Sequence, residues 1–170
     1  MRRKSSHRGG LLFFNGVIHI DVQLAPAYMD RPLFLDIAKD YVDALAQYDS
    51  SIRWDEVTWR NAIWRASFIM EDRTVQGFVI TDTVPFHIFP SALYIAEFYV
   101  VPEARRRGLG IEAVKAITGH WSGDVFLYIL KKNALARLFW ADVEAELGWT
   151  RIERPEIQEE DGCELRVYKT

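Results

Sequence analysis

The sequence lacks most features of a secreted or metal-stabilised protein. Its 170 residues contain one cysteine, Cys163, so no internal disulfide can form. Its four histidines lie far apart in sequence, and no two are spaced four residues apart: His7, His19, His87 and His120. One thiol and scattered imidazoles predict no metal site. The low cysteine content favours a reducing, cytoplasmic compartment.

Long apolar runs are missing as well. The segment Leu11–Phe14 is too short to serve as the core of a signal peptide, and Asn15, His19 and Asp21 interrupt its continuation. No stretch of the sequence approaches the length needed to span a bilayer. We therefore expect neither export nor a membrane partner.

Linkers, repeats and low-complexity segments are absent after the first ten residues. Residues 1–10 carry four basic side chains and no acid, so the rest of the chain has a net charge of about −7. We predict a flexible basic arm at 1–10 and one domain at 11–170. The arm could contact nucleic acid or phosphate, but a solvated terminus is the preferred interpretation. The acidic body argues against a nucleic-acid partner.

Apolar residues, in contrast, are abundant, and many of them are aromatic. They make up 49% of the chain, which contains 6 Trp, 7 Tyr and 10 Phe. Because each ring buries a large area, this composition predicts an ordered domain with a well-filled interior or a large concave surface.

Hydrophobic periodicity predicts an α/β (α+β) fold in which helices cover a mixed sheet. Asp30 and Asn133 are candidate helix N-caps, and Gly148 is a candidate C-cap. Glu97 is the only charge in an otherwise apolar segment, which indicates a central strand. The expected apolar positions of the last helix are Leu135, Leu138, Phe139, Val143 and Leu147. The predicted order is strand 18–24, helices 30–48 and 55–64, strands 66–70, 75–84 and 92–101, turn 105–110, helix to 119, strand 125–130, helix 133–147, and strands 149–154 and 163–169.

The turn at 105–110 carries the clearest chemical signal. A strand–turn–helix junction presents unpaired N–H groups and the positive end of a helix dipole, which together bind anions. Gly108 and Gly110 allow close backbone approach, and three arginines add positive charge. These features predict a phosphate or pyrophosphate ligand. The segment lacks the Lys-Ser/Thr of a P-loop, and Ala113 stands where a dinucleotide fingerprint has its third glycine.

Two motifs resemble those of the GNAT superfamily of N-acetyltransferases. Arg105-x-x-Gly108-x-Gly110 resembles the pyrophosphate-binding signature of that family. Asn133-x-x-Ala136-x-x-Phe139-Trp140, followed by Leu147-Gly148-Trp149, resembles its Asn-x-x-Ala-x-x-x-Tyr helix and Leu-Gly-Phe ending. Both motifs fall on the elements that the family requires. The resemblance covers 66–170 well and 17–64 by element order alone.

The resemblance implies a sheet of about seven strands with about four helices, in which two parallel central strands, 92–101 and 125–130, splay apart. Acetyl-CoA would lie in that gap, with its pantetheine arm on the first strand and its pyrophosphate on the turn. Asn133 would hydrogen-bond the arm near the thioester. By the same matching, the cofactor-binding residues are Phe98, Tyr99, Val100, Arg105, Arg106, Arg107, Gly108, Leu109, Gly110, Asn133 and Trp140.

The implied reaction is direct attack of a primary amine on the acetyl thioester in a ternary complex, which makes the protein an N-acetyltransferase. Because the amine must first lose a proton, a general base is expected. Glu97 is the first candidate, although a lone strand glutamate is often paired with an arginine. Where some members place a glutamate, this chain has Tyr128, and Trp140 replaces a tyrosine thought to protonate the thiolate. Water, Tyr128 or Tyr99 could supply that proton, or the thiolate could leave unprotonated.

Several features leave alternatives open. The acids Glu156, Glu159, Glu160 and Asp161 could attract a cationic amine, either a small molecule or a peptide, or could form a solvated loop. Trp54, Trp59 and Trp64 could shape an acceptor pocket or pack in the core. The departure at Trp140 also permits a catalytically weak or inactive acyl-CoA-binding module, and a purely structural domain is a third possibility. We expect a monomer or homodimer.

Overall fold

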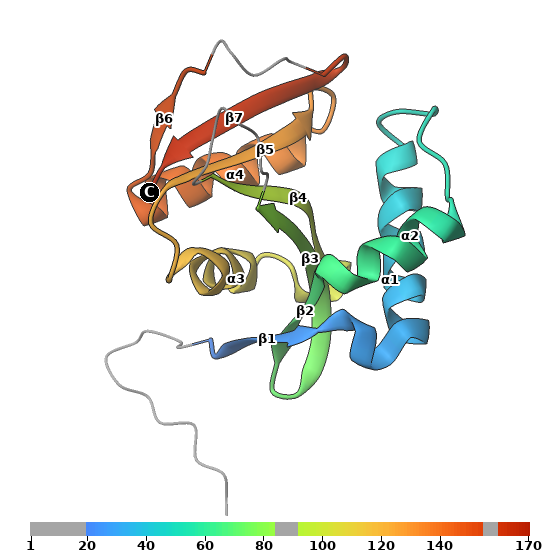
Figure 1. The fold of residues 1–170 in the computed structure, drawn as a ribbon. Helices are drawn as coiled ribbons and strands as arrows, with labels where there is room; N and C mark the ends of the chain where they lie inside the picture. Colours follow the sequence, from blue (N-terminus) through green and yellow to red (C-terminus); the bar gives the residue numbers. More distant parts are fainter. Residues whose placement is uncertain (1–19, 84–91, 155–159) are drawn as a thin grey trace, which may run out of the picture.

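A computed structural model describes residues 20–83, 92–154 and 160–170. These residues form a seven-stranded mixed sheet in the order β1-β2-β3-β4-β5-β7-β6, with helices on both faces (Figure 1). The predicted mixed sheet and the predicted element order are confirmed. The strands are β1 Val22–Pro26, β2 Ala66–Glu71, β3 Thr74–Thr83, β4 Leu93–Val100, β5 Asp124–Leu130, β6 Thr150–Ile152 and β7 Cys163–Lys169.

Four α-helices are present in the described residues: α1 Arg31–Ala46, α2 Glu56–Ala62, α3 Leu109–Thr118 and α4 Ala134–Leu147. Side-chain caps begin three of them. Asp30 Oδ1 accepts from Leu33 N at 3.2 Å, Asp55 caps α2, and Asn133 Oδ1 accepts from Ala136 N at 3.0 Å. Gly148, with a left-handed φ of 65°, ends α4. The predicted caps are therefore confirmed.

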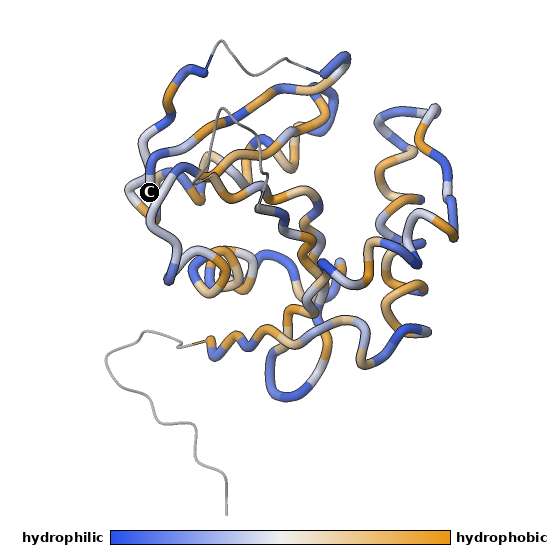
Figure 2. Tube along the Cα trace, viewed as in Figure 1, coloured by the Kyte–Doolittle hydropathy of each residue, from blue (hydrophilic) through white to orange (hydrophobic). Residues whose placement is uncertain are grey.

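The core has a major cluster on each face of the sheet. Phe34 and Trp59 of α1 and α2 pack on one face, and Val114 and Trp140 of α3 and α4 pack on the other. In Figure 2 the central strands are coloured mostly hydrophobic, whereas the turn between β2 and β3 is hydrophilic. This two-sided cover explains why β4 and β5 are apolar on both faces.

Two apolar positions of the predicted last helix are exposed, and so is one apolar residue of the predicted strand 18–24. Leu24 shares a strand face with Val22, but β1 is an edge strand and only Val22 joins the cluster beneath α3. Leu135 and Leu138 are each 64% exposed, because the buried stripe of α4 runs one residue away from each. That stripe consists of Ala136, Phe139, Trp140, Val143 and Leu147.

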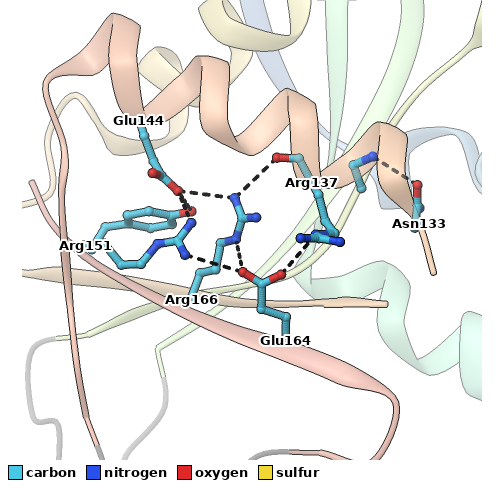
Figure 3. Close-up of polar contacts among 8 residues, drawn as sticks. Asn133, Arg137, Glu144, Arg151, Glu164 and Arg166 are labelled. Carbon is cyan, nitrogen blue, oxygen red and sulfur yellow. Dashed lines mark hydrogen bonds and ion pairs between the residues drawn. The ribbon is translucent and has the colours of Figure 1, made fainter. Parts of the chain in front are cut away.

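A polar network ties β7 to α4 (Figure 3). The buried Arg166 guanidinium donates from Nε to Glu164 Oε1 at 2.8 Å and from Nη1 to Glu144 Oε1 at 3.2 Å. Arg151 and the Tyr168 hydroxyl also donate to Glu144, each at 2.7 Å. These contacts hold the helix that begins at Asn133 against the sheet.

Candidate functional site

The two parallel central strands separate soon after they begin. β4 pairs with β5 only at Leu93 with Val125 and at Tyr94 with Phe126. A register shift between Ile80 and Thr81 in the β3–β4 ladder leaves Ala96 as an extra residue of β4, two residues after Tyr94, and such a bulge favours a bend in the strand that contains it. The predicted splay is confirmed, and a cleft of about 300 Å³ occupies the gap.

Residues from both faces of the sheet line this cleft. On the α4 side they include Asn133, Ala136 and Trp140, and on the α1 side Tyr41 and Leu45. The cleft therefore connects the two layers of helices through the sheet. The other lining residues are Ile52, Tyr94, Ile95, Ala96, Glu97, Phe98, Leu127, Tyr128, Ile129, Leu130, Glu160 and Cys163.

Glu97 lies in this cleft with a tyrosine as its partner. It accepts a hydrogen bond from the Tyr41 hydroxyl at 2.5 Å, and no arginine pairs with it in the part of the chain described. Burial raises the pKa of the Glu97 carboxyl above its ordinary value, the Tyr41 hydrogen bond opposes this rise, and the nearby Glu160 charge adds to it. A carboxylate with a raised pKa in a cleft can accept a proton near neutral pH.

Tyr41 is the site residue that the sequence interpretation missed. It occupies the apolar stripe of α1, where its ring contacts Trp59, Phe78 and Tyr99 at centroid distances of 5.3–6.0 Å. Helical periodicity explains such a residue as core. Only its hydroxyl, which reaches across to Glu97, marks a second role, and no sequence spacing predicts that contact.

Asn133, Trp140 and Tyr128 all line the cleft, as the family matching requires of the first two. Trp140 is buried, with its ring 5.7 Å from that of Phe98. Burial raises the pKa of the Tyr128 hydroxyl, and the nearby Glu160 and Cys163 add to this effect. The Tyr128 hydroxyl is therefore protonated at neutral pH. The Tyr99 side chain does not line the cleft; it packs against Phe78.

The turn before α3 has the backbone shape of an anion site. Gly108 is the N-cap of α3 with φ 87°, it makes no side-chain cap, and Arg106 is also left-handed at φ 60°. The first N–H groups of α3 have no partner within the helix. Among the described residues, only Ile20 lies near the side-chain position of Gly108, with its Cδ1 at 3.5 Å from an added Cβ.

Two of the three arginines in this turn have partners in the protein. Arg105 Nε donates to the Val100 carbonyl at 2.7 Å, and its guanidinium lies 5.3 Å from the Tyr99 ring centroid. Arg107 pairs with Glu71 at 2.8 Å. The backbone carbonyl of Val100, one of the residues expected to bind the cofactor, therefore already accepts a hydrogen bond from Arg105.

Gly110 has a packing role. A Cβ at this position would lie 2.8 Å from the Phe139 ring, so the glycine lets α3 approach α4. In the sequence, Gly110 is a position predicted to allow close approach of a ligand. The close neighbour observed is instead a side chain of the second motif.

Of the remaining candidate residues, some line the cleft and others do not. Trp54 and Trp59 stack at 6.0 Å in the core, whereas Trp64 is 65% exposed beside Tyr28, and none of the three lines the cleft. Glu160 does line it, and Asp161 is exposed nearby in sequence. The following expectations fall outside the described residues: the basic arm at 1–10, Leu11–Phe14, His19, His87, Glu156 and Glu159.

Two features are absent from the described residues. These residues contain no cluster of three or more His, Cys, Asp or Glu side chains suited to a metal ion. They also include no helix with the length and apolar character required for a membrane span.

Comparison with known families gives one match. The model described as "Acetyltransferase (GNAT) family" matches residues 32–143, which include nearly all of α1, most residues that line the cleft and most of α4. A search of curated proteins found no match to this sequence.

Solved structures with the same fold are distant in sequence. Diaminobutyrate acetyltransferase EctA from Paenibacillus lautus, in complex with L-2,4-diaminobutyric acid and coenzyme A, has a TM-score of 0.64 at 12% identity, covering 89% of this chain and 96% of that one. A GNAT-family acetyltransferase from Bacillus cereus ATCC 10987 has a TM-score of 0.60 at 18% identity, with coverage of 89% and 96%. PaiA N-acetyltransferase from Thermoplasma acidophilum, in complex with coenzyme A, has a TM-score of 0.58 at 14% identity, with coverage of 88% and 99%.

Proposed function

Because the chain belongs to the acetyltransferase (GNAT) family, we propose that it transfers an acetyl group from acetyl-CoA to a primary amine in the cleft between β4 and β5. The observation that carries the proposal is the separation of these strands after Tyr94, with Glu97 and Asn133 both lining the gap. A gap through the sheet lets a thioester and an amine meet from opposite faces.

The residues present fit the donor. Within the described residues, the β4 edge beyond Tyr94 has no strand partner on the β5 side, so its backbone is available to a pantetheine arm. Gly108 and the first turn of α3 suit a diphosphate, because unpaired N–H groups and the helix dipole favour anions. Asn133 caps α4 through Oδ1, which leaves its amide N–H₂ group to hydrogen-bond the arm. Acetyl-CoA, when bound, supplies the acetyl thioester.

Glu97 is the proposed general base, acting directly or through one water. A primary ammonium has a pKa of about 10 and is mostly charged at neutral pH, so its proton must be removed. Glu97 first takes the ammonium proton and passes it to solvent. As the neutral amine nitrogen then forms the new C–N bond, the C–S bond breaks, the sulfur leaves as a thiolate, and the second nitrogen proton passes to Glu97. Water carries this second proton from Glu97 to the group that protonates the thiolate. Tyr128, which is protonated at neutral pH and lines the cleft, is the proposed proton donor to that thiolate.

Trp140 supports a second candidate function. An indole N–H is not a usable acid, and this residue stands where the family pattern has a tyrosine. A protein that binds acyl-CoA with little or no transfer would tolerate this change. The cofactor and the cleft would be the same, but no acceptor would react.

The single cysteine supports a cytoplasmic location for the protein, whether it is an acetyltransferase or an acyl-CoA-binding module.

Thermal unfolding with acetyl-CoA tests the donor. Acetyl-CoA at 100 times its Kd should stabilise the native state by about 2.7 kcal/mol. S-acetylpantetheine, which lacks the diphosphate, is the matched control and should raise the Tm less. No shift with acetyl-CoA well above micromolar concentrations would refute the donor assignment.

Release of free thiol in the presence of polyamines, aminoglycosides and peptides tests the transfer. Acceptor-dependent thiol release is expected. Binding of acetyl-CoA without thiol release from any acceptor would favour the acyl-CoA-binding alternative.

A further inference from the structure

The α1 side of the cleft carries two acids and no base. Glu97 and Glu160 are the only charged side chains among the described residues that line the cleft. No lysine or arginine of the described chain lines it. The acceptor end, defined as Tyr41, Leu45, Ile52, Tyr94, Glu97, Tyr128, Glu160 and Cys163, is therefore negative wherever it is charged.

The rest of this acceptor end is aromatic and aliphatic. Tyr94 and Tyr128 meet edge to face at 6.1 Å and 88°, and Leu45 and Ile52 line the side formed by α1 and the segment after it. Aromatic faces attract cations, and apolar walls favour an apolar body. An ammonium group attached to an alkyl or aryl chain finds partners here for both of its parts.

A carboxylate on the acceptor would find no cationic partner among the described residues that line the cleft. Burying an unpaired carboxylate is costly, and proximity to Glu97 or Glu160 adds repulsion. The hydroxyl of Tyr41 cannot compensate fully, because it already donates to Glu97. An amino acid with a free carboxylate beside its amine is therefore a poor fit to this pocket.

We infer that the acceptor is a small primary amine on an apolar body without a carboxylate, and that Glu160 helps to select it. This inference rests on the proposed acetyl transfer. Glu160 attracts the incoming ammonium and repels a substrate carboxylate. Glu97 then accepts one nitrogen proton as the C–N bond forms and the C–S bond breaks.

Three acceptors that share one phenyl group test the selectivity: 2-phenylethylamine, L-phenylalaninamide and L-phenylalanine. The kcat/KM for 2-phenylethylamine should exceed that for L-phenylalanine by at least about 100-fold. The amide should be accepted, since it adds similar bulk without charge. An α-amino group is less basic than an alkylamine, which favours the amino acid, so differences in amine basicity cannot explain its rejection.

The variant Glu160→Gln tests the residue, with Asp161→Asn as the control. Asp161 is also exposed and acidic but does not line the cleft. Glu160→Gln should raise the KM for 2-phenylethylamine about threefold and leave the KM for acetyl-CoA unchanged. It should also reduce the ratio of kcat/KM for 2-phenylethylamine to kcat/KM for L-phenylalanine. Asp161→Asn should change none of these values.

Four outcomes would contradict the inference or one of its parts. Equal use of L-phenylalanine and 2-phenylethylamine would overturn the inference alone. Rejection of the amide together with the amino acid would also overturn it, since size and not charge would then decide. Equal effects of the two variants would remove Glu160 from the pocket. If acetyl-CoA binds and no amine in either panel is acetylated, the proposed function fails, and the inference fails with it.

Discussion

Glu97 is an ionisable side chain held where ionisation is unfavourable. Burial raises its pKa, and the Tyr41 hydroxyl, 2.5 Å away, stabilises the ionised form and limits the rise. Glu160 acts in the opposite sense to Tyr41 by repelling the charge. Two neighbours that act in opposite directions tune one carboxyl, which is the arrangement expected of a base that works near neutral pH.

Tyr41→Phe is expected to move the pH–rate profile to higher pH. The substitution removes the hydrogen bond that lowers the pKa of Glu97, so the carboxyl ionises at higher pH and the rising limb of kcat/KM shifts upward. Glu97→Gln should lower kcat by about 10²- to 10⁴-fold and remove that limb. Initial rates across pH measure both effects.

Tyr48→Phe is the control for this pair, because Tyr48 follows α1 but does not line the cleft. Its profile should match that of the wild type. A Tyr41→Phe profile that stays in place or moves to lower pH would contradict the assigned role of the hydroxyl.

The turn after β4 and the start of α3 contain two glycines with different structural roles. Gly108 adopts a left-handed backbone that directs the chain into α3, and Gly110 leaves room for the Phe139 ring. The first glycine faces largely open space, whereas the second is enclosed by a neighbouring helix. The side-chain direction is therefore open at the first position and closed at the second, whereas contact of either backbone N–H with a ligand stays a prediction.

Gly108→Ala and Gly148→Ala form a matched pair at this scale. Both glycines have a left-handed φ, 87° and 65° respectively, so alanine at either site should cost about 1–2 kcal/mol of stability. Gly108→Ala should also weaken acetyl-CoA binding severalfold, because relief of the strain reorients the N–H groups of the turn. Gly148→Ala, at the C-terminal end of α4, should leave the affinity for acetyl-CoA unchanged.

Calorimetric titration with acetyl-CoA and denaturant unfolding give the two readouts for this pair. Equal affinities of the two variants for acetyl-CoA would show that the Gly108 turn is not part of the donor site.

The whole molecule depends on contacts that join the sheet to its helices. The network around Arg166 connects β7 with α4 and, through Arg151, with β6. Burial opposes ionisation of Glu144 and Glu164, but hydrogen bonds from Arg151 and Tyr168 to Glu144 and from Arg166 to Glu164 hold both pKa values below the ordinary one. These ion pairs therefore stabilise the fold at neutral pH.

Acid should weaken this network. A carboxyl whose pKa is lowered by folding contributes stability above its unfolded pKa of about 4.3, and that stability is lost as the pH falls through the folded pKa. The free energy of unfolding of the wild type should therefore drop below about pH 4.3. Glu97 has a raised pKa and acts in the opposite direction at higher pH.

Arg166→Ala should cost about 2 kcal/mol at pH 7, because Glu144 and Glu164 each lose one of their basic partners while others remain, and it should reduce the loss in acid. Lys39→Ala is the control, since it breaks an exposed pair with Asp43 and should cost less than about 0.5 kcal/mol. Urea unfolding at pH 7 and below pH 4 measures both. Equal costs for the two variants would mean that the network has no structural role.

Much of this molecule follows from signals that act over one or two helical turns. Asp30, Asn133 and Gly148 mark helix ends through contacts with backbone three or four residues away, so the sequence alone predicts them. The two motifs are likewise local, and their order along the chain suffices to indicate the family and a cleft between two strands.

Tertiary packing decided the rest. The hydrogen bond between Tyr41 and Glu97 joins residues 56 positions apart, and it exists because α1 packs on the face of β4 where the carboxyl emerges. Packing also decided that Leu138 faces solvent and that Gly110 accommodates Phe139. Hydrophobic periodicity predicts that a helix has an apolar side. The neighbouring element decides which residues of that side are buried and which polar atoms meet across the sheet.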